Sequence, residues 1–212
     1  MRINEESLVS LREKIQSRMS GKRLAHTLAV EKMAVRIGKL YCPDKLDILA
    51  SAALLHDITK EKTTEEHIEI CKMHGAEYTS DNVAAPKTFH AISAAATIPH
   101  EFSDFAIDEV ISAVRYHTTG RADMTLTEKI IYLADYIDDT RTFPDCVKLR
   151  EMFWGVDVEA MGEDERICHL DRVVLTSLEM TIADLVENGM VVNADTTAAK
   201  DSLLEKYNHG ET

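Results

Sequence analysis

The chain has 212 residues, of which 45% are hydrophobic and 29% charged, and its 37 acidic against 24 basic side chains give a formal net charge of −13 at pH 7. Such an excess of acid argues against a nucleic acid or an anionic membrane surface as the main partner. An anionic substrate therefore has to be met by a few Lys or Arg side chains or by bound cations. A chain of this length forms one domain or at most two small ones, and we expect one, residues 1–212. Because only 8 Gly and 4 Pro interrupt the chain, long helices are favoured.

The N-terminal stretch MRINEESLVS carries Glu5 and Glu6, where a secretory signal would need basic residues followed by an apolar run. Elsewhere, too, the apolar runs fall short of a membrane span. We therefore expect a cytoplasmic protein. The four cysteines are scattered without a C-x-x-C pair, which predicts reduced thiols rather than disulfides or a thiolate zinc site.

Helical periodicity begins near the N-terminus and places a histidine on a buried face. An amphipathic helix is expected from about Glu5 to Met19, and Ser20-Gly21 separates it from a second helix in KRLAHTLAVEKMAVRIGKLY. In the second helix the inward positions, at helical spacing, are His26, Val30, Met33, Ile37 and Leu40. His26 therefore points toward the core.

The third expected helix, Lys45 to about Asp57, is apolar almost all round and ends in two ionisable groups within AALLHDITK. Asp44 can cap its start. An acid in the last turn faces the negative end of the helix dipole, which costs about 0.3–1 kcal/mol. A cation beside Asp57 would reverse that cost, so His56 and Asp57 indicate either a metal site or a helix that simply ends there.

Two further segments are predicted as helices with histidines of different character. Thr63 and Glu66 form a capping-box pattern for a short helix that ends at His74-Gly75, with Gly75 as the left-handed stop. In this helix His67 is expected to be an exposed first-turn residue. The small-residue segment KTFHAISAAATIPHEF carries His90 near its start and is expected to close at Pro99.

The second half of the chain is also expected to be helical. IDEVISAVRYHTTG places His117 on an inward face and stops at Gly120, and TLTEKIIYLADYIDDTR carries Asp135 at the border of its apolar face. Residues 143–165 are predicted to be less regular. LDRVVLTSLEMTIADLVENG and TTAAKDSLLEKY form the last two helices, with a stop at Asn188-Gly189, so the predicted fold class is all-α.

Six inward ionisable side chains need a common explanation. Any one buried histidine is more often a satisfied core residue than a ligand. Burying this many groups without partners would cost several kcal/mol each, whereas shared divalent cations offset most of that cost. The residues that point to a metal site together are His26, His56, Asp57, His90, His117 and Asp135.

This ordered set resembles the signature of HD-domain metal-dependent phosphohydrolases. More closely, RLAHTLAV, AALLHDITK, YHTTG and IIYLADYIDDTR resemble the YqeK-type symmetrical diadenosine tetraphosphate hydrolases, also described as symmetrical bis(5'-nucleosyl)-tetraphosphatases. The resemblance spans residues 22–150 and resumes weakly in NADTTAAKDSLL. It implies an all-α HD-domain helical bundle, with the C-terminal helices, 166–208, packing on the signature region.

The resemblance also implies two metal ions per chain. His26, His56, Asp57 and Asp135 would bind one ion, and His90 and His117 the other, with Asp57 able to bridge. The family favours iron, and the same imidazole and carboxylate ligands suit manganese, cobalt, nickel or zinc. Two such ions can hold a bridging hydroxide and direct it at a phosphorus atom. On this interpretation His56 and Asp57, together with Lys60, are the catalytic residues.

Several residues are candidates to contact the substrate. Lys60 and Arg141 suit phosphate binding, and the alternative for both is a solvated surface charge. The further candidates are His117, Thr118, Gly120 and Lys200, for which a structural helix stop or an exposed lysine is the alternative. The chain departs from the family pattern at Asp138-Asp139-Thr140, where Glu-Pro is usual, and in a longer segment at 151–166, which we expect to shape the pocket.

Three functions fit these observations. The first is symmetrical cleavage of diadenosine tetraphosphate to two ADP. The second is an HD-type nucleotidase or phosphatase that acts on another small phosphate ester. The third is a non-catalytic metal- or nucleotide-binding sensor, against which the second histidine pair, His90 and His117, argues because a structural site needs no second ion. Apolar positions on the terminal helices would permit a homodimer.

Overall fold

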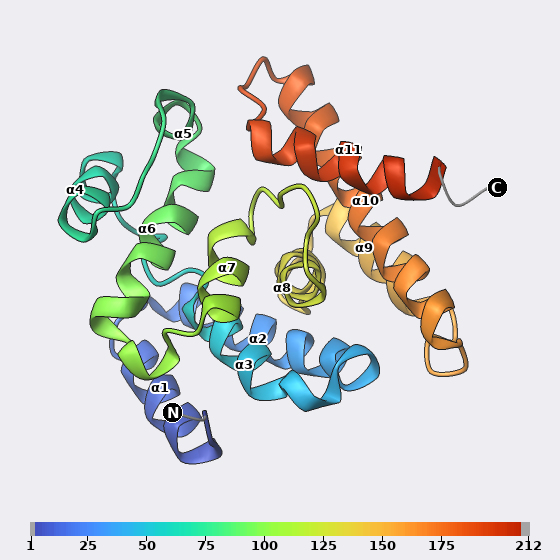
Figure 1. Cartoon of the computed structure of the whole chain (residues 1–212), viewed down its shortest axis with the longest axis horizontal. Helices are drawn as coiled ribbons and strands as arrows, with labels where there is room; N and C mark the ends of the chain where they lie inside the picture. The colour runs from blue at the N-terminus through green and yellow to red at the C-terminus, as the bar shows by residue number, and fades with distance from the viewer. Residues whose placement is uncertain (1–2, 209–212) are drawn as a thin grey trace.

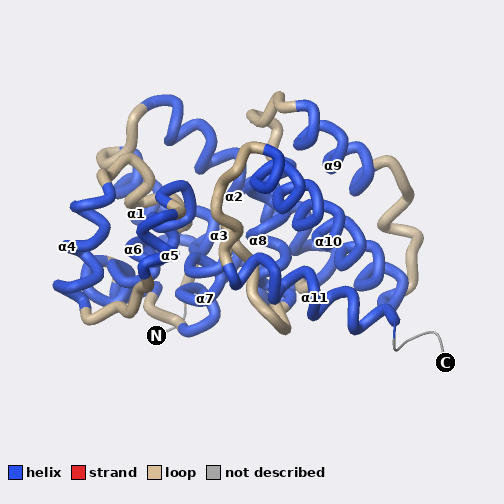
Figure 2. The backbone as a smooth tube through the Cα atoms, turned by 90° about the horizontal axis from the view of Figure 1, so that it is seen from above, coloured by secondary structure: helices blue, strands red, loops and turns tan. Residues whose placement is uncertain are grey.

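The computed structural model describes residues 3–208, which form helices joined by turns and loops (Figure 2). These residues contain no strand, which confirms the all-α prediction. The ends of the expected domain, residues 1–2 and 209–212, lie outside the described residues. The helices are α1 (Glu5–Gln16), α2 (Gly21–Tyr41), η1 (Pro43–Lys45), α3 (Leu46–Leu55), α4 (Thr64–His74), α5 (Ser80–Ala84), α6 (Pro86–Glu101), η2 (Ser103–Phe105), α7 (Asp108–Tyr116), α8 (Leu126–Ile137), α9 (Pro144–Trp154), α10 (Glu163–Glu187) and α11 (Ala194–Asn208).

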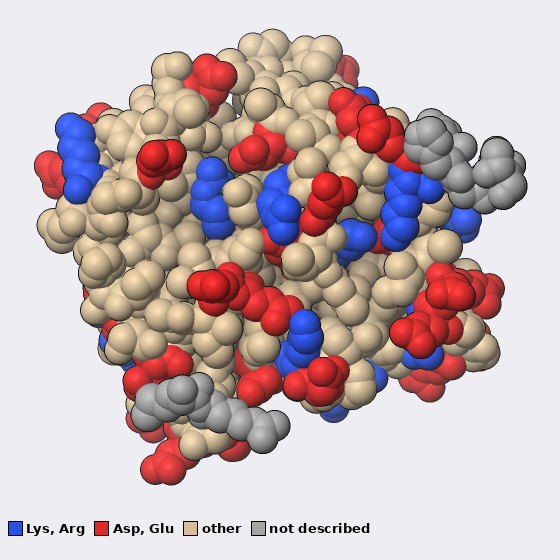
Figure 3. Space-filling model, viewed as in Figure 1, with Lys and Arg blue, Asp and Glu red and all other residues tan. Residues whose placement is uncertain are grey.

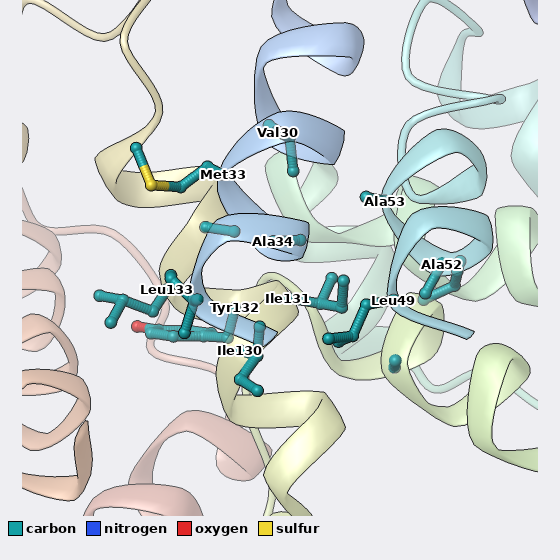
Figure 4. Packing of buried hydrophobic residues seen from close by; sticks show 14 of the residues in the cluster. Val30, Met33, Ala34, Leu49, Ala52, Ala53, Ile130, Ile131, Tyr132 and Leu133 are labelled. Atoms are coloured by element: carbon teal, nitrogen blue, oxygen red, sulfur yellow. The ribbon is translucent and has the colours of Figure 1, made fainter. Parts of the chain in front are cut away.

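Helix α8 is the centre of the bundle. Figure 1 looks along it, with α2 and α3 on one side, α7 on another and α9 to α11 beyond. All of its residues from Ile130 to Ala134 are fully buried, so neighbours cover it on every side. Figure 4 shows Ile131 beside Leu49 of α3, whereas the ring of Tyr132 points away from α3 and its hydroxyl lies 3.3 Å from Ser177 Oγ of α10 (Glu163–Glu187). Each large apolar side chain buried in this way contributes about 1.5–3 kcal/mol to folding.

The close approach of α2 and α3 depends on Gly38. A Cβ atom added at this position would lie 2.3 Å from Leu49 Cδ1. Because Gly38 has no side chain, the short apolar helix α3 packs directly on α2, and its residues from Leu49 to Leu55 are all buried. This packing fixes the C-terminal end of α3, where His56 follows, against the helix that carries His26.

The turn signals of the sequence are confirmed at the ends of several helices. Thr63 Oγ1 accepts from the backbone N–H of Glu66, whose carboxylate accepts in return from the N–H of Thr63. Gly75 and Gly189 follow their helices with positive φ, at 67° and 63°, as predicted, whereas α7 ends at Tyr116 and Gly120, with φ 65°, follows the turn 117–119.

The start and end of α3 differ from the prediction. Asp44 does not cap the helix, because residues 43–45 form a 3₁₀ turn in which Lys45 N–H donates to the carbonyl of Cys42. At the other end the helix stops at Leu55, so Asp57 lies in the turn that follows it rather than in its last turn. His56 provides a physical reason, since its Nδ1 lies 2.6 Å from the Ala53 carbonyl, which a continuing helix would pair with the N–H of Asp57.

Three other expectations are wrong. His67 is buried rather than exposed, because α4 packs on α6 and His67 Nδ1 lies 2.8 Å from Ser93 Oγ. Pro99 lies inside α6, which continues to Glu101, since a proline so near the C-terminal end removes a single backbone bond. The region 143–165 contains α9, whose Pro144 sets the first helical φ and whose Phe153 is buried in the core.

Helices α10 and α11 complete the bundle. The Tyr136 hydroxyl bonds with Thr181 Oγ1 at 2.8 Å, which ties α8 to α10. On the face shown in Figure 3, acidic and basic side chains are interspersed. Among the described helices, none combines the length and the hydropathy needed to cross a bilayer.

Candidate metal centre

The six residues expected to bind metal lie in one cluster at the heart of the bundle. They come from α2, the turns after α3 and α7, α6 and α8. Their imidazole nitrogens and carboxylate oxygens form overlapping groups of three in which all donor atoms lie within 4.8 Å of one another. The helices therefore bring together His26, His56, Asp57, His90, His117 and Asp135.

Asp57 occupies the middle of this cluster. Its Oδ2 faces His56 Nε2 at 3.4 Å and His26 Nε2 at 3.8 Å. Its Oδ1 faces His90 Nε2 at 3.0 Å and His117 Nε2 at 3.6 Å. The two oxygens of one carboxylate thus face two different histidine pairs, which is the arrangement of a bridging ligand.

His56 and His117 are each oriented by a hydrogen bond to a backbone carbonyl three residues earlier. His56 Nδ1 lies 2.6 Å from the Ala53 carbonyl and His117 Nδ1 lies 2.7 Å from the Val114 carbonyl. A carbonyl oxygen only accepts, so each Nδ1 carries the proton and each Nε2 keeps its lone pair. Both Nε2 atoms then face the cluster in the tautomer that binds metal.

His26 is held by two carboxylates. Its Nε2 lies 2.9 Å from Asp135 Oδ1 and its Nδ1 lies 3.3 Å from Asp138 Oδ2. Burial alone would lower the pKa of His26, but the hydrogen bonds to Asp135 and Asp138 outweigh it and raise the pKa to about 9. This role of Asp138 was not predicted from the sequence, although its position three residues after Asp135 was an available signal.

The protonation states in the cluster suit a cation. Burial would raise the pKa of Asp57, but His56, His117 and His90 hold it well below its usual range. The pKa of Asp135 is also held low, against the effect of burial, chiefly by His26. Burial lowers the pKa of His90 to about 3 and lowers that of His117 as well, so both imidazoles are neutral. Ionised carboxylates and neutral imidazoles are the forms that bind metal, so Asp57, Asp135, His90 and His117 are in those forms, whereas His26, with a pKa of about 9, would release a proton on binding an ion.

An unpartnered nitrogen supports the same interpretation. The Nε2 atom of His56 is buried and makes no hydrogen bond within residues 3–208. Leaving such a group unpaired costs about 1–3 kcal/mol. A divalent cation would satisfy this nitrogen, and a set of imidazoles and carboxylates suits iron, manganese, cobalt, nickel or zinc. The residues present therefore fit a metal centre.

Three cations surround the cluster. Arg141 Nη2 lies 2.6 Å from Asp135 Oδ1. The guanidinium therefore reaches the cluster although the residues before it, Asp138-Asp139-Thr140, depart from the family pattern. Lys60 Nζ lies 3.1 Å from His90 Nε2, and burial lowers the pKa of Lys60. Arg23 Nη1 contacts Asp57 Oδ2 at 2.5 Å. Arg23 was not predicted from the sequence, although it precedes His26 by three residues on the same helix face.

A cavity of about 430 Å³ opens beside the cluster. Lys60, Thr118 and Arg141 line it together with Asp135, and Thr118 Oγ1 is buried without a hydrogen-bond partner among the described residues. Helix α9 contributes residues up to Leu149 to the lining, which precede the segment 151–166 that we expected to shape the pocket.

Two predicted substrate contacts lie elsewhere. Gly120 is buried against α11, where an added Cβ would lie 2.9 Å from the Cβ of Ala199. Lys200 Nζ pairs with Asp201 Oδ1 at 3.0 Å. Within residues 3–208 neither one lines the cavity, so the structure does not bring Gly120 or Lys200 to the cluster.

Known proteins are similar to this chain in sequence and in fold. The HD domain family model matches residues 23–140. A protein of Bacillus subtilis (strain 168) named bis(5'-nucleosyl)-tetraphosphatase, symmetrical, is 30% identical over 197 residues, covering 91% of this chain and 92% of the relative. A Staphylococcus aureus (strain NCTC 8325 / PS 47) protein of the same name is 28% identical and covers 92% of each chain. The crystal structure of a predicted HD superfamily hydrolase involved in NAD metabolism from Clostridium acetobutylicum has a TM-score of 0.79 at 28% identity, covering 93% of this chain and 96% of that chain.

Proposed function

This chain belongs to the HD-domain family, and on that basis we propose that it is a metal-dependent hydrolase that cleaves diadenosine tetraphosphate symmetrically into two molecules of ADP. The substrate is that of the enzymes named for this reaction, to which the chain is 28–30% identical over nine-tenths of its length. The observation that carries the proposal is the position of Asp57, whose two oxygens face separate histidine pairs.

We propose two ions per chain, which that position supports. His26, His56 and Asp135 would hold one ion with Asp57 Oδ2, and His90 and His117 would hold the other with Oδ1. We propose iron for both, as the family resemblance implies. When bound, such ions supply Lewis acidity toward phosphoryl oxygens and lower the pKa of water.

The chain's own cations suit a phosphate chain that passes across the centre. Lys60 lies on the side of His90, whereas Arg23 contacts the oxygen of Asp57 that faces His26 and His56. Phosphates on both sides of a scissile bond within the chain would therefore meet positive charge, and the symmetrical position of the cut is proposed from the name of the relatives. Arg141 offers a planar fork for bidentate contact, and Lys60 a point charge.

Product analysis tests this proposal directly. The protein purified without chelator is incubated with diadenosine tetraphosphate, and ADP is expected as the sole product. Formation of ATP together with AMP would contradict symmetrical cleavage. Inorganic phosphate released from nucleoside monophosphates, without turnover of the dinucleotide, would support a phosphatase instead. Binding of metal and nucleotide without turnover of either substrate would support a sensor.

A pair of histidine variants tests the dependence on the cluster. His90→Ala is expected to remove about one of two metal ions per chain and to lower the rate by more than about 100-fold. His74→Ala is the matched control, because His74 stacks on His100 with ring centroids 4.0 Å apart, away from the cluster. It should keep the metal content and the rate. Equal activity in both variants would contradict the proposed centre.

A further inference from the structure

The cavity beside the metal centre has two chemically different ends. At the cluster it is lined by cations and a hydroxyl, namely Lys60, Arg141 and Thr118. Toward α9 and α10 the lining becomes apolar and acidic. The residues at this second end are Phe143, Asp145, Leu149, Met180, Asp184 and Leu185.

The register of α10 shows that this second end extends away from the predicted metal ligands. Ser177 Oγ lies 3.3 Å from the Tyr132 hydroxyl, and Thr181 Oγ1 lies 2.8 Å from the Tyr136 hydroxyl, so α8 and α10 advance together. Asp184 follows Thr181 by three residues, which corresponds to about 4.5 Å along the helix axis. The cavity therefore continues nearly one turn beyond the level of Tyr136, which adjoins Asp135.

Phe143 is the aromatic side chain at this end of the cavity. It is 66% exposed although it is aromatic, and it immediately precedes α9 on the wall of the cavity. An exposed aromatic ring is a platform on which a flat, apolar group stacks favourably. Asp145 and Asp184 line the same end and repel phosphate, so the occupant there must be the uncharged part of a substrate whose phosphates lie at the cations.

We infer that this end of the cavity binds the base of one ADP half of the substrate, with Phe143 as the stacking residue. The inference rests on the proposed function for the identity of the nucleotide. The volume of about 430 Å³ is that of a small-ligand site.

A second hollow on the other side of Arg141 is chemically different. It has a volume of about 370 Å³, and its lining is polar throughout: Ser20, Lys22, Arg23, His26, Glu61, Thr140 and Arg141. This hollow suits phosphate and ribose rather than a base. The two halves of a symmetrical substrate would therefore make different contacts with the protein. Phe143 would stack on one of the two bases only.

Calorimetric binding of ADP and of pyrophosphate to the metal-loaded protein tests the assignment. Base–aromatic stacking corresponds to about a 5- to 150-fold change in affinity. Phe143→Ala is therefore expected to weaken ADP binding by that factor while pyrophosphate binds as in the unchanged protein, and Phe143→Trp should retain ADP affinity. Val186→Ala is the matched control, because Val186 is 63% exposed on α10 and is not among the residues that line the cavity. It should leave ADP affinity unchanged.

The outcomes separate this inference from the proposed function. If Phe143→Ala binds ADP as tightly as the unchanged protein does, the base site is wrong, whether or not diadenosine tetraphosphate is cleaved. An equal loss of ADP and pyrophosphate affinity would also overturn it, because the phosphate end alone would then be affected. If the protein cleaves no dinucleotide but shows the selective loss of ADP affinity, the base site stands and the proposed reaction fails.

Discussion

Replacing Asp171 with Asn should destabilise the protein strongly without touching the metal centre. Asp171 lies on α10 and is fully buried. Its Oδ1 accepts from Lys129 Nζ of α8 at 2.6 Å and its Oδ2 from Lys206 Nζ of α11 at 2.6 Å. One carboxylate therefore joins three helices.

The size of the expected loss in stability follows from the solvent exposure of the two lysine side chains. The Lys129 side chain is only 11% exposed, so Asp171→Asn leaves an ammonium buried without its counterion, at a cost of about 3–5 kcal/mol. The Lys206 side chain is 51% exposed, and its pair contributes at most about 1 kcal/mol. For a chain of this size each kcal/mol lowers Tm by about 2–4 °C, so Asp171→Asn should lower it by about 6–20 °C.

Urea unfolding followed by circular dichroism measures this effect. The midpoint should fall in Asp171→Asn at an unchanged slope, and Lys206→Met should change the free energy of unfolding by less than about 1 kcal/mol. The double variant with Lys129→Met should recover most of the loss, because no charge is then left buried. A single Asp171→Asn effect below about 1 kcal/mol, or a double variant as unstable as the sum of its singles, would refute the reasoning.

Three other regions give sharp expectations. Asp138→Asn should weaken metal binding about 10- to 100-fold in a chelator competition, because the buried carboxylate that orients His26 loses its charge. An unchanged metal affinity would argue against that role of Asp138. Gly38→Ala should lower the free energy of unfolding, measured by urea titration, by about 1–3 kcal/mol, since the added Cβ would meet Leu49. An unchanged urea midpoint would contradict the close packing of α2 on α3. A thiol reagent should label only Cys168 quickly in the native protein, because the other three cysteines are buried. Burial also raises the pKa of those three thiols, that of Cys42 to about 11. Rapid labelling of all four cysteines would be inconsistent with this packing.

Local chemistry in the sequence was sufficient for helix ends that depend on neighbouring residues. The capping box of Thr63 and Glu66 and the left-handed Gly75 need only a few consecutive residues, so their pattern predicts them directly. Local pattern failed for His67, which has the pattern of a surface residue but is buried because α6 covers it. The expected stop at Pro99 was wrong for a local reason, since the proline lies near the C-terminal end of its helix.

Helical periodicity was enough to predict that His26 and His117 face inward, and the resemblance to the HD signature implied that Asp57 can bridge the two histidine pairs. The structure added which oxygen of Asp57 faces each pair and at what distance. It also decided that Arg23 and Asp138 support the cluster. These contacts join segments far apart in the chain, and their distances depend on how closely α2, α3 and α8 pack. Periodicity gives the face of each helix, whereas packing alone sets the distance between faces.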